Sequence, residues 1–445
     1  MPALAPFRGI RYASQADLSS LICPPYDVIT PELREALAAR SPHNLVHLVL
    51  DRERPGDGPG DNRYTRAARY FREWQQQGIL KRDPRPALYA LEQSFPAPDG
   101  RPMVRRGFLA AVRLHDFGEK IVVPHECTLP AVRADRLALI SEVRANLSPV
   151  FGLYEDDANV AIHALAGSFG GEAVAQADSD DGVHHRMWRV EDPEIIAAVQ
   201  KILAARRVLI ADGHHRYEAA LAYRDRLVRA EPDLPPDGGH QHVLMFLCST
   251  SDPGLVIYPT HRALAGLAGF RLADLLERLP RYFKVETIAE DVRRPAGRAW
   301  AVSKLSEHLG KSSAFLMVTA EDQKGRILTL MDEADLSGVP LPRNENLRAL
   351  DVSALHGIVF EALLGLSPAS VGRQENVRYL LDADEAVART LAGEFQVAFL
   401  LNPTPMWQVQ AVGEAGETMP QKSTYIYPKI PGGMVFRDID PRGTP

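Results

Sequence analysis

The 445-residue sequence contains only three cysteines, Cys23, Cys127 and Cys248, which lie far apart. They form no C-x-x-C pair, which excludes the usual zinc knuckle and the thioredoxin-like redox motif. An odd and sparse set of cysteines is typical of a reducing compartment rather than of a disulfide-stapled secreted fold. We therefore expect a cytoplasmic protein that needs no covalent cross-links.

Long apolar runs and export signals are absent as well. The sequence has no run of about 18 apolar residues, so no transmembrane helix is predicted. Its N-terminus lacks a basic stretch followed by an apolar one, which is the pattern of a secretory signal peptide. We expect no membrane among the partners of this protein.

The charge balance argues against a nucleic-acid-binding protein. The net charge is −6 and there is no long basic run, whereas binding to a phosphate backbone depends on clustered Lys and Arg. Walker A loops, dinucleotide fingerprints and the HExxH zinc motif are also missing. Gly310-Lys-Ser-Ser comes nearest to a Walker A loop, but position 305 is Leu instead of Gly. We therefore expect no nucleic-acid partner.

What the sequence does have is the composition of an ordinary globular protein. Hydrophobic residues make up 45% and charged residues 24%, and the length is enough for two or three domains. Helix and strand patterns are mixed along the sequence. Strands are expected at 44–50, 87–95, 104–114, 243–248, 255–258, 314–319, 327–331 and 396–402. Helices are expected at 31–39, 64–78, 193–203, 272–279, 350–364 and 384–395.

One polar cluster lies where a strand pattern meets a helix pattern. Val208-Leu-Ile is a short apolar run, the Asp-Gly of Asp212-Gly-His-His-Arg makes a sharp turn, and residues 217–223 form an alanine-rich helix. The residues after the glycine therefore lie at or near a helix N-terminus, where unpaired N–H groups and the helix dipole attract anions. An Arg at such an end can grip a phosphate with two hydrogen bonds.

This cluster divides into two predicted roles. Gly213, His215 and Arg216 are expected to bind phosphate or nucleotide, and Asp212 and His214 are expected to take part in catalysis. Asp212 also offers an oxygen ligand for Mg²⁺ or a proton acceptor. The alternative is a plain helix start, with Asp212 as the N-cap and two surface histidines.

A second polar cluster, Pro124-His-Glu, follows an apolar strand pattern. Transfer of a phosphate held at the helix start to a hydroxyl would need a carboxylate to orient or accept the hydroxyl proton, and cations to hold the phosphates. Glu126 is the best carboxylate for this catalytic role, and Arg136 is a cation that follows it in the sequence. The alternative is a surface salt bridge between Glu126 and Arg136.

Further polar residues lie at strand ends or on rigid loops, where binding sites are usually built. The predicted substrate-binding residues are Tyr26, Asp27, His125, Arg136 and Asn146. The predicted phosphate-binding residues outside the Asp212–Arg216 cluster are Thr260, His261, Arg262, Lys422, Ser423 and Thr424. We expect these clusters to line one cleft; the alternative is a set of separate structural turns.

Asp212-Gly-His-His-Arg after an apolar strand resembles the phosphate-binding box of the ParB/sulfiredoxin superfamily, and in particular the box of its free serine kinases. A wider resemblance, over nearly the whole chain, is to the bacterial and archaeal family called domain of unknown function 1015. The segments that carry it are Cys23-Pro-Pro-Tyr-Asp-Val, Pro124-His-Glu, Asn146-Leu-Ser-Pro, Asp212-Gly-His-His-Arg-Tyr, Thr260-His-Arg and Lys422-Ser-Thr-Tyr.

These resemblances imply an α+β fold, with mixed sheets and flanking helices. They also imply a ParB/sulfiredoxin-like core with phosphate chemistry at the strand–helix turn. On this basis the chain is expected to contain an N-terminal α+β region (1–120), the phosphate-binding core (121–265) and a C-terminal α+β region (266–445) that returns a polar loop to the site. The implied activity is that of a small-molecule kinase, which transfers a phosphoryl group to the hydroxyl of free L-serine.

The expected partners are a phosphate donor and an amino-acid acceptor, with Mg²⁺ as the cofactor. The donor could be ATP, ADP or pyrophosphate, because no adenine-binding motif is readable in the sequence. Two alternatives stay open: a nucleotide-binding switch or scaffold without turnover, and a phosphohydrolase in which water replaces the hydroxyl acceptor. The sequence also leaves a homodimer open.

Overall fold

The computed structural model describes residues 3–14, 17–97 and 100–445. Contacts between residues divide the chain into two compact units. Unit 1 comprises Met1–Pro124, Thr128–Val256 and Pro428–Pro445, and unit 2 comprises His125–Cys127 and Ile257–Tyr427. The regions expected from the sequence follow different boundaries, since strands from both 1–120 and 121–265 share the main sheet of unit 1.

The main sheet of unit 1 has nine strands, in the order β6-β11-β8-β12-β5-β4-β10-β9, with β1 paired to β5. It is mixed, because β11 runs parallel to β6 and β12 runs parallel to β8 within an otherwise antiparallel arrangement. Its strands are β1 (Leu4–Ala5), β4 (Leu88–Pro96), β5 (Pro102–Arg113), β6 (Val122–Val123), β8 (Val150–Tyr154), β9 (Ala175–Asp178), β10 (His184–Val190), β11 (Val208–Asp212) and β12 (His242–Ser249). Two small sheets accompany it, formed by β2 (Ile10–Tyr12) with β3 (Leu80–Arg82) and by β7 (Ala145–Asn146) with β21 (Arg437–Asp438).

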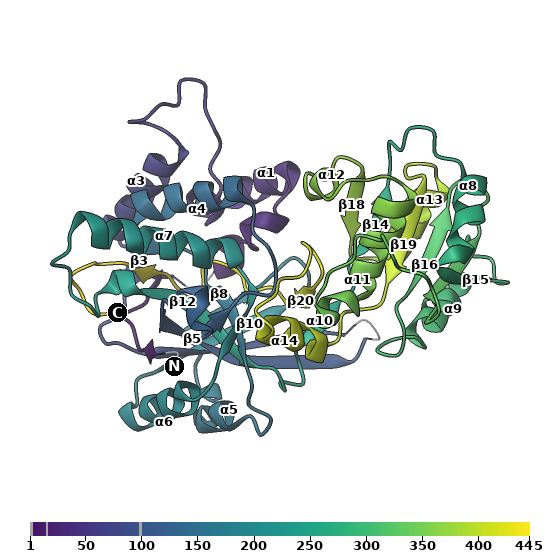
Figure 1. Cartoon of the computed structure of the whole chain (residues 1–445). Helices are drawn as coiled ribbons and strands as arrows, with labels where there is room; N and C mark the ends of the chain where they lie inside the picture. The colour runs from purple at the N-terminus through teal and green to yellow at the C-terminus, as the bar shows by residue number, and fades with distance from the viewer. Residues whose placement is uncertain (1–2, 15–16, 98–99) are drawn as a thin grey trace. The chain divides into compact units, whose positions relative to one another are not determined.

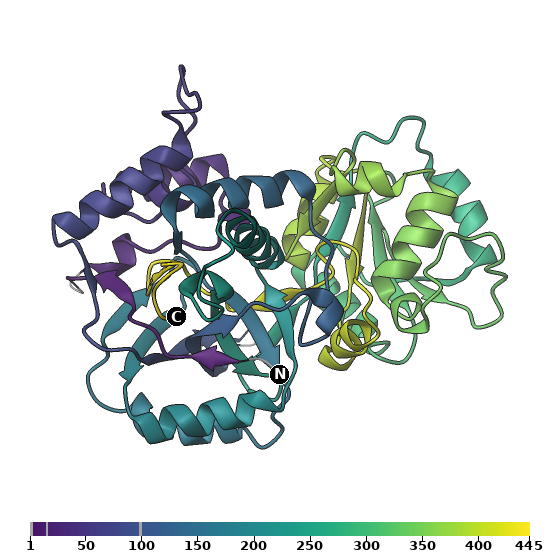
Figure 2. The same ribbon diagram turned by 60° about the vertical axis from the view of Figure 1, so that its left-hand side comes forward.

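Helices cover both faces of this sheet. Figures 1 and 2 show α3, α4 and α7 on one face and α5 and α6 on the other. The helices of unit 1 are α1 (Pro31–Arg40), α2 (Val46–Val49), α3 (Arg63–Gln76), α4 (Pro130–Val143), α5 (Val160–Ala164), α6 (Pro193–Ala204) and α7 (His214–Ala230). Short 3-10 turns lie at Leu18–Ser20, Tyr26–Val28, Phe117–Glu119, Ala166–Phe169 and Gly239–Gln241.

The core of unit 1 follows the alternation of side chains along its central strands. Phe108 and Val112 of β5 lie opposite Leu247 and Val243 of the antiparallel β12, so that all four side chains share one face. They are buried in the same apolar cluster as Val199 of α6. Because the sheet is covered on both faces, its central strands read as nearly continuous apolar runs.

Two helix starts predicted from the sequence are confirmed. The Thr30 side chain accepts a hydrogen bond from the N–H of Leu33, with Pro31 at the first position of α1. The Asp192 side chain accepts a hydrogen bond from the N–H of Glu194 at the start of α6. In both cases a short oxygen-bearing side chain satisfies an N–H group that the helix itself leaves unpaired.

The strand expected at 44–50 is wrong, because these residues form the short helix α2. The side-chain oxygen Oδ1 of Asn44 accepts a hydrogen bond from the N–H of Val46, and its Nδ2 donates to the backbone carbonyl oxygens of Ser20 and Ile22. This buried side chain turns the backbone into a helix that the short apolar run alone did not reveal. A run of this length and composition is compatible with either a strand or a buried helix.

Unit 2 is built on a fully antiparallel six-stranded sheet, in the order β15-β17-β16-β19-β14-β18. Its strands are β14 (His261–Leu264), β15 (Phe283–Thr287), β16 (Ala314–Thr319), β17 (Gly325–Leu330), β18 (Val377–Leu380) and β19 (Val397–Leu401). A small separate sheet pairs β13 (Val256–Tyr258) with β20 (Tyr425–Tyr427). The helices are α8 (Leu272–Arg278), α9 (Pro295–Ser306), α10 (Glu345–Arg348), α11 (Asp351–Ala354), α12 (Pro368–Gly372), α13 (Ala383–Leu391) and α14 (Met406–Glu414). A 3-10 turn at Leu279–Arg281 follows α8, and a π-helical segment, Leu355–Leu363, continues α11.

The predicted α+β class is therefore confirmed, with several sheets and flanking helices, whereas the ParB/sulfiredoxin-like core stays a prediction. The strands expected at 87–95 and 104–114 are confirmed and pair as the antiparallel hairpin of β4 and β5; residues 98 and 99 lie outside the described residues. Every helix in the described ranges is too short or too polar to span a bilayer.

We expect Phe108→Ala to destabilise unit 1 by about 3–5 kcal/mol, because it removes a fully buried ring from the centre of the sheet. Val104→Ala on the same strand is the control; its side chain is 39% exposed, so the change should stay within about 0.5 kcal/mol. Urea unfolding followed by circular dichroism measures both. Equal losses for the two variants would contradict the proposed core.

Candidate phosphate-binding site

The strand–turn–helix predicted around Asp212 is present, and its helix begins three residues earlier than expected. β11 ends at Asp212, Gly213 adopts a left-handed conformation with φ of 88°, and α7 begins at His214. A Cβ at Gly213 would lie 2.9 Å from the guanidinium group of Arg216, so both the turn and the close approach of Arg216 require glycine. The alternative of a plain helix start, with Asp212 as the N-cap and two surface histidines, is wrong. Gly213 is the N-cap, and His214 is only 8% exposed.

Asp212 lies between two cations of unit 1. Its Oδ1 accepts from the Lys429 ammonium group at 2.5 Å, and its Oδ2 accepts from the Arg216 guanidinium group at 2.6 Å. Burial alone would raise the pKa of the Asp212 carboxyl, but the charges of Lys429 and Arg216 outweigh it and hold that pKa well below its usual range. The carboxylate is therefore permanently ionised at neutral pH and is a weak proton acceptor.

Four residues predicted from separate parts of the sequence line one cavity of about 60 Å³ in unit 1: Tyr26, Arg136, Asn146 and Arg216. The Arg136 guanidinium group lies 4.2 Å from the centroid of the Tyr26 ring and donates to the carbonyl oxygen of Val49. Asp27 belongs to the same 3-10 turn as Tyr26. Two arginines and a tyrosine thus line one small cavity beside the start of α7, whose other lining residues are mostly apolar.

The histidine His215 is oriented by a contact at the start of α4. Its Nε2 accepts a hydrogen bond from the backbone N–H of Leu129 at 2.9 Å. This contact requires an unprotonated Nε2, so the ring is neutral with its proton on Nδ1. Any contact of His215 with a phosphate therefore uses the Nδ1–H group as a neutral donor.

Unit 2 contains a second polar group around Glu126. Oε1 of Glu126 accepts from the backbone N–H of Lys422 at 2.8 Å, and Nε2 of His125 lies 2.9 Å from Oγ1 of Thr424. Ser423 donates to the carbonyl oxygen of Pro420 within the same loop. The polar loop at 422–424 thus pairs with the His125–Glu126 segment within unit 2.

Arg262 joins this second group from the interior of the sheet. It is 1% exposed, donates to the carbonyl oxygen of Lys422 at 2.9 Å and lies over the Tyr379 ring. Burial lowers the pKa of Arg262 to about 10, and the neighbouring Tyr379 and Glu126 oppose that shift. Thr260 is buried as well, so this segment is no surface turn.

His261 is also a buried residue of β14. Its Nδ1 accepts from the backbone N–H of Leu401 at 3.2 Å. Burial, together with the charge of Arg262, lowers the pKa of His261 to about 4, so the ring is neutral at physiological pH. A phosphate subsite at this position would depend on Arg262 for its positive charge.

The predicted residues thus form two groups, one in each unit. Unit 1 contains Tyr26, Asp27, Arg136, Asn146, Asp212, Gly213, His214, His215 and Arg216, and unit 2 contains His125, Glu126, Thr260, His261, Arg262, Lys422, Ser423 and Thr424. That both groups line one cleft stays a prediction, as does the alternative pairing of Glu126 with Arg136, because each joins residues of different units.

Lys429 and Tyr379 contribute to these groups and were not singled out from the sequence. Lys429 follows the predicted phosphate-binding residues Lys422, Ser423 and Thr424 by a few positions in the sequence. Its partner Asp212 is more than two hundred residues away, so no local pattern could have paired them. Tyr379 gave no signal, because one aromatic residue in a strand pattern is ordinary core.

The residues around Asp212 do not form an evident magnesium site. Both Asp212 oxygens already accept from cations, and the described residues contain no group of three or more His, Cys, Asp or Glu that could hold a metal ion. Mg²⁺ therefore stays a prediction.

The family model described as "Protein of unknown function (DUF1015)" matches residues 4–353. The chain belongs to this family. None of the curated proteins compared with the chain matches it.

Among solved structures, the chain is similar to a mutant free serine kinase in complex with AMP, at 13% identity and a TM-score of 0.38 over 78% of this chain and 94% of the kinase. A conserved hypothetical protein from Pyrococcus furiosus has 14% identity and a TM-score of 0.34, covering 72% of this chain and 92% of its own. C-terminally truncated SbnI from Staphylococcus aureus has 13% identity and a TM-score of 0.31; the match covers 76% of this chain and 85% of the SbnI chain. All three scores lie below 0.5, so these likenesses assign no activity to this chain.

We expect Asp212→Asn to cost about 3–5 kcal/mol of stability at pH 7, because it leaves two largely buried cations without the carboxylate that both contact. The pKa of Asp212 is lower in the folded than in the unfolded chain. The ionised Asp212 carboxylate therefore stabilises the fold above the pKa that Asp212 has in the unfolded chain, near 4. This stabilisation is lost as the pH falls below that value. The stability gap between parent and variant should stay constant from pH 7 to about pH 5 and then narrow.

Urea unfolding of both proteins between pH 3 and pH 7 measures this gap. Asp237→Asn is the matched control, because Asp237 also pairs with an arginine but is 81% exposed. That change should cost less than about 1 kcal/mol. A gap for Asp212→Asn as small as that of the control would show that the two ion pairs of Asp212 contribute little.

Proposed function

We propose that this protein is a small-molecule kinase that transfers a phosphoryl group to the hydroxyl of free L-serine. The observation that carries the proposal is the arrangement at the start of α7, where backbone N–H groups, Arg216 and Lys429 surround the end of β11. The choice of serine as acceptor depends on the resemblance of the Asp212–Arg216 box to free serine kinases.

The donor phosphates are assigned to the start of α7. The helix has 17 residues, so its first turn presents unpaired N–H groups and the positive end of a full helix dipole. Asp212 holds Arg216 in place through one of its terminal nitrogens. Phosphoryl transfer depends mainly on positioning and on cations that offset the charge of the transition state, and these groups supply both.

The base that accepts the serine hydroxyl proton is assigned to Glu126. Its Oε1 is fixed by the N–H of Lys422, which orients the carboxylate without neutralising it. Asp212 is a poorer candidate, because the charges of Lys429 and Arg216 hold its pKa well below the usual range and a carboxylate so stabilised is a weak base. The two carboxylates therefore take different roles, one as base and one as anchor for the cations.

Product analysis tests the reaction class. The protein is incubated with Mg²⁺, with ATP, ADP or pyrophosphate in turn, and with a panel of free amino acids, and the products are followed by phosphorus NMR. Phosphoserine supports the proposal, and a different phosphorylated amino acid would show that the acceptor is not serine. Free phosphate alone would indicate a phosphohydrolase, and binding without any product would favour a switch or scaffold.

Within this activity, Glu126→Gln should lower turnover by about 10²–10⁴ with little change in donor affinity, because the amide keeps the shape but is a far poorer base. Arg216→Ala should instead weaken donor binding, because it removes charge that the ground state already uses. His215→Ala should act in the same direction. Single-turnover kinetics and calorimetry of donor binding separate the two effects.

Each variant is first checked for a melting temperature close to that of the parent. Glu231→Gln is the control, since Glu231 is a half-exposed partner of Arg442 and its loss should leave turnover and affinity unchanged. If Glu126→Gln turned over normally but bound the donor poorly, Glu126 would be a binding residue, and the base would have to be sought at Asp27 or Asp212.

A further inference from the structure

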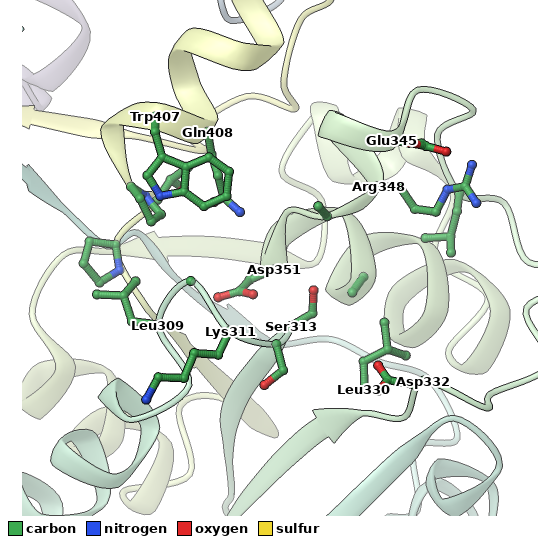
Figure 3. Close-up of a pocket in the computed structure, with 18 of the residues that line it drawn as sticks. Leu309, Lys311, Ser313, Leu330, Asp332, Glu345, Arg348, Asp351, Trp407 and Gln408 are labelled. Atoms are coloured by element: carbon green, nitrogen blue, oxygen red, sulfur yellow. The ribbon is translucent and has the colours of Figure 1, made fainter.

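Unit 2 has a groove that is lined by none of the site residues predicted from the sequence. Its volume is about 500 Å³, which is within the range of small-molecule sites. It is formed by the loop Leu309–Ser313, the end of β17, helices α10 and α11, and the start of α14 (Figure 3). The loop contains Gly310-Lys-Ser-Ser, the segment nearest to a Walker A loop in the sequence.

An aromatic side chain at the mouth of the groove is largely exposed. Trp407, at the start of α14, is 58% exposed, whereas Trp74 and Trp188 are each only 4% exposed. Figure 3 shows its ring beside Gln408 on one side of the groove. An exposed indole next to a cavity is a ready stacking surface for a flat ligand, because every aromatic base offers a π-face.

An acid group lies opposite this ring. Figure 3 places the Asp351 carboxyl between Trp407 and the loop that carries Ser313. Its Oδ1 faces the N–H of Ala314 at 3.4 Å, which is too long for a strong hydrogen bond. Burial raises the pKa of Asp351 to about 7, so near neutral pH the carboxyl presents an O–H donor and an oxygen acceptor side by side.

The charged groups that line the groove around Asp351 are few. Lys311 belongs to the loop, Asp332 follows β17, and Glu345 and Arg348 belong to α10. In Figure 3 the ammonium end of Lys311 points away from the Asp351 carboxyl. The charged ends of Glu345 and Arg348 lie at the end of the groove that is away from Trp407. A paired donor and acceptor beside a stacking surface is the arrangement that reads the edge of a nucleobase.

We infer that this groove binds a planar nitrogen heterocycle of the nucleobase type, which stacks on Trp407 and pairs through its polar edge with Asp351. Gln408 and Ser313 are further polar contacts on either side. The inference concerns a site within unit 2 and does not depend on the kinase proposal, because it predicts binding of an unphosphorylated base and no turnover.

Adenosine is the probe, and calorimetry measures its binding to the full chain. Trp407→Ala should lower the affinity about 5- to 150-fold, the range expected for loss of one base–aromatic stack. Trp300→Ala is the matched control, because Trp300 is also exposed, at 37%, but lies on α9 beneath Lys304. That variant should bind adenosine like the parent.

Variants of Asp351 test the hydrogen-bonding part of the inference in the same binding experiment. Asp351→Asn should retain binding, because the amide also offers a donor and an acceptor side by side, whereas Asp351→Leu should abolish it. In the parent, affinity should fall about tenfold between pH 6 and pH 8 as the carboxyl loses its proton. The Asn variant has no proton to lose, so its affinity should not change over this range.

Three results would overturn the inference. One is the absence of adenosine binding, or binding that neither Trp407→Ala nor Asp351→Leu weakens. Another is loss of binding in Arg216→Ala, which would place adenosine at the start of α7 instead. The third is tight binding of choline that strengthens as the pH rises, which would make the groove a cation site formed by an aromatic ring and a carboxylate.

Discussion

The ion-pair cluster of Asp212 with Arg216 and Lys429 is the constraint on which the functional part of unit 1 depends. A buried carboxylate is costly unless its charge is matched, and here each oxygen accepts from a different cation. The same contacts tie the end of β11 to the first turn of α7 and to the segment that begins at Pro428. The groups that hold the turn in place are therefore the groups that give it its charge.

The last eighteen residues of the chain are part of this arrangement. Arg437 is fully buried and donates to Asn146 and to the carbonyl oxygens of His242 and Gly239, while β21 pairs with β7. The segment that supplies Lys429 is thus fixed to the middle of unit 1 by hydrogen bonds formed after a long excursion of the chain through unit 2. Such an arrangement depends on contacts between residues that are hundreds of positions apart.

Local chemistry explains why some features were predictable. The turn at Asp212-Gly, the starts of α1 and α6 and the β4–β5 hairpin each depend on residues within a few positions of one another, and all are as the sequence indicates. The helix α2 was missed because Asn44 is satisfied by the distant loop at Ser20–Ile22. For the same reason the sequence did not reveal that Arg262 is buried: its burial depends on β18 and β19, which lie more than a hundred residues further along the chain.

Two aspartates show how the same side chain acquires opposite properties from its surroundings. Asp212 and Asp351 are both withdrawn from water, which by itself raises the pKa of a carboxyl group. Two cations reverse that effect at Asp212. Asp351 faces the N–H of Ala314 at 3.4 Å, which does not offset its burial, so its pKa stays raised, at about 7. Asp212 is therefore suited to hold positive groups around an anion, and Asp351 to exchange or share a proton with a neutral ligand. These opposite surroundings favour different ligands, a charged one beside Asp212 and an uncharged ring beside Asp351, and so support treating the groove of unit 2 as a separate proposed site.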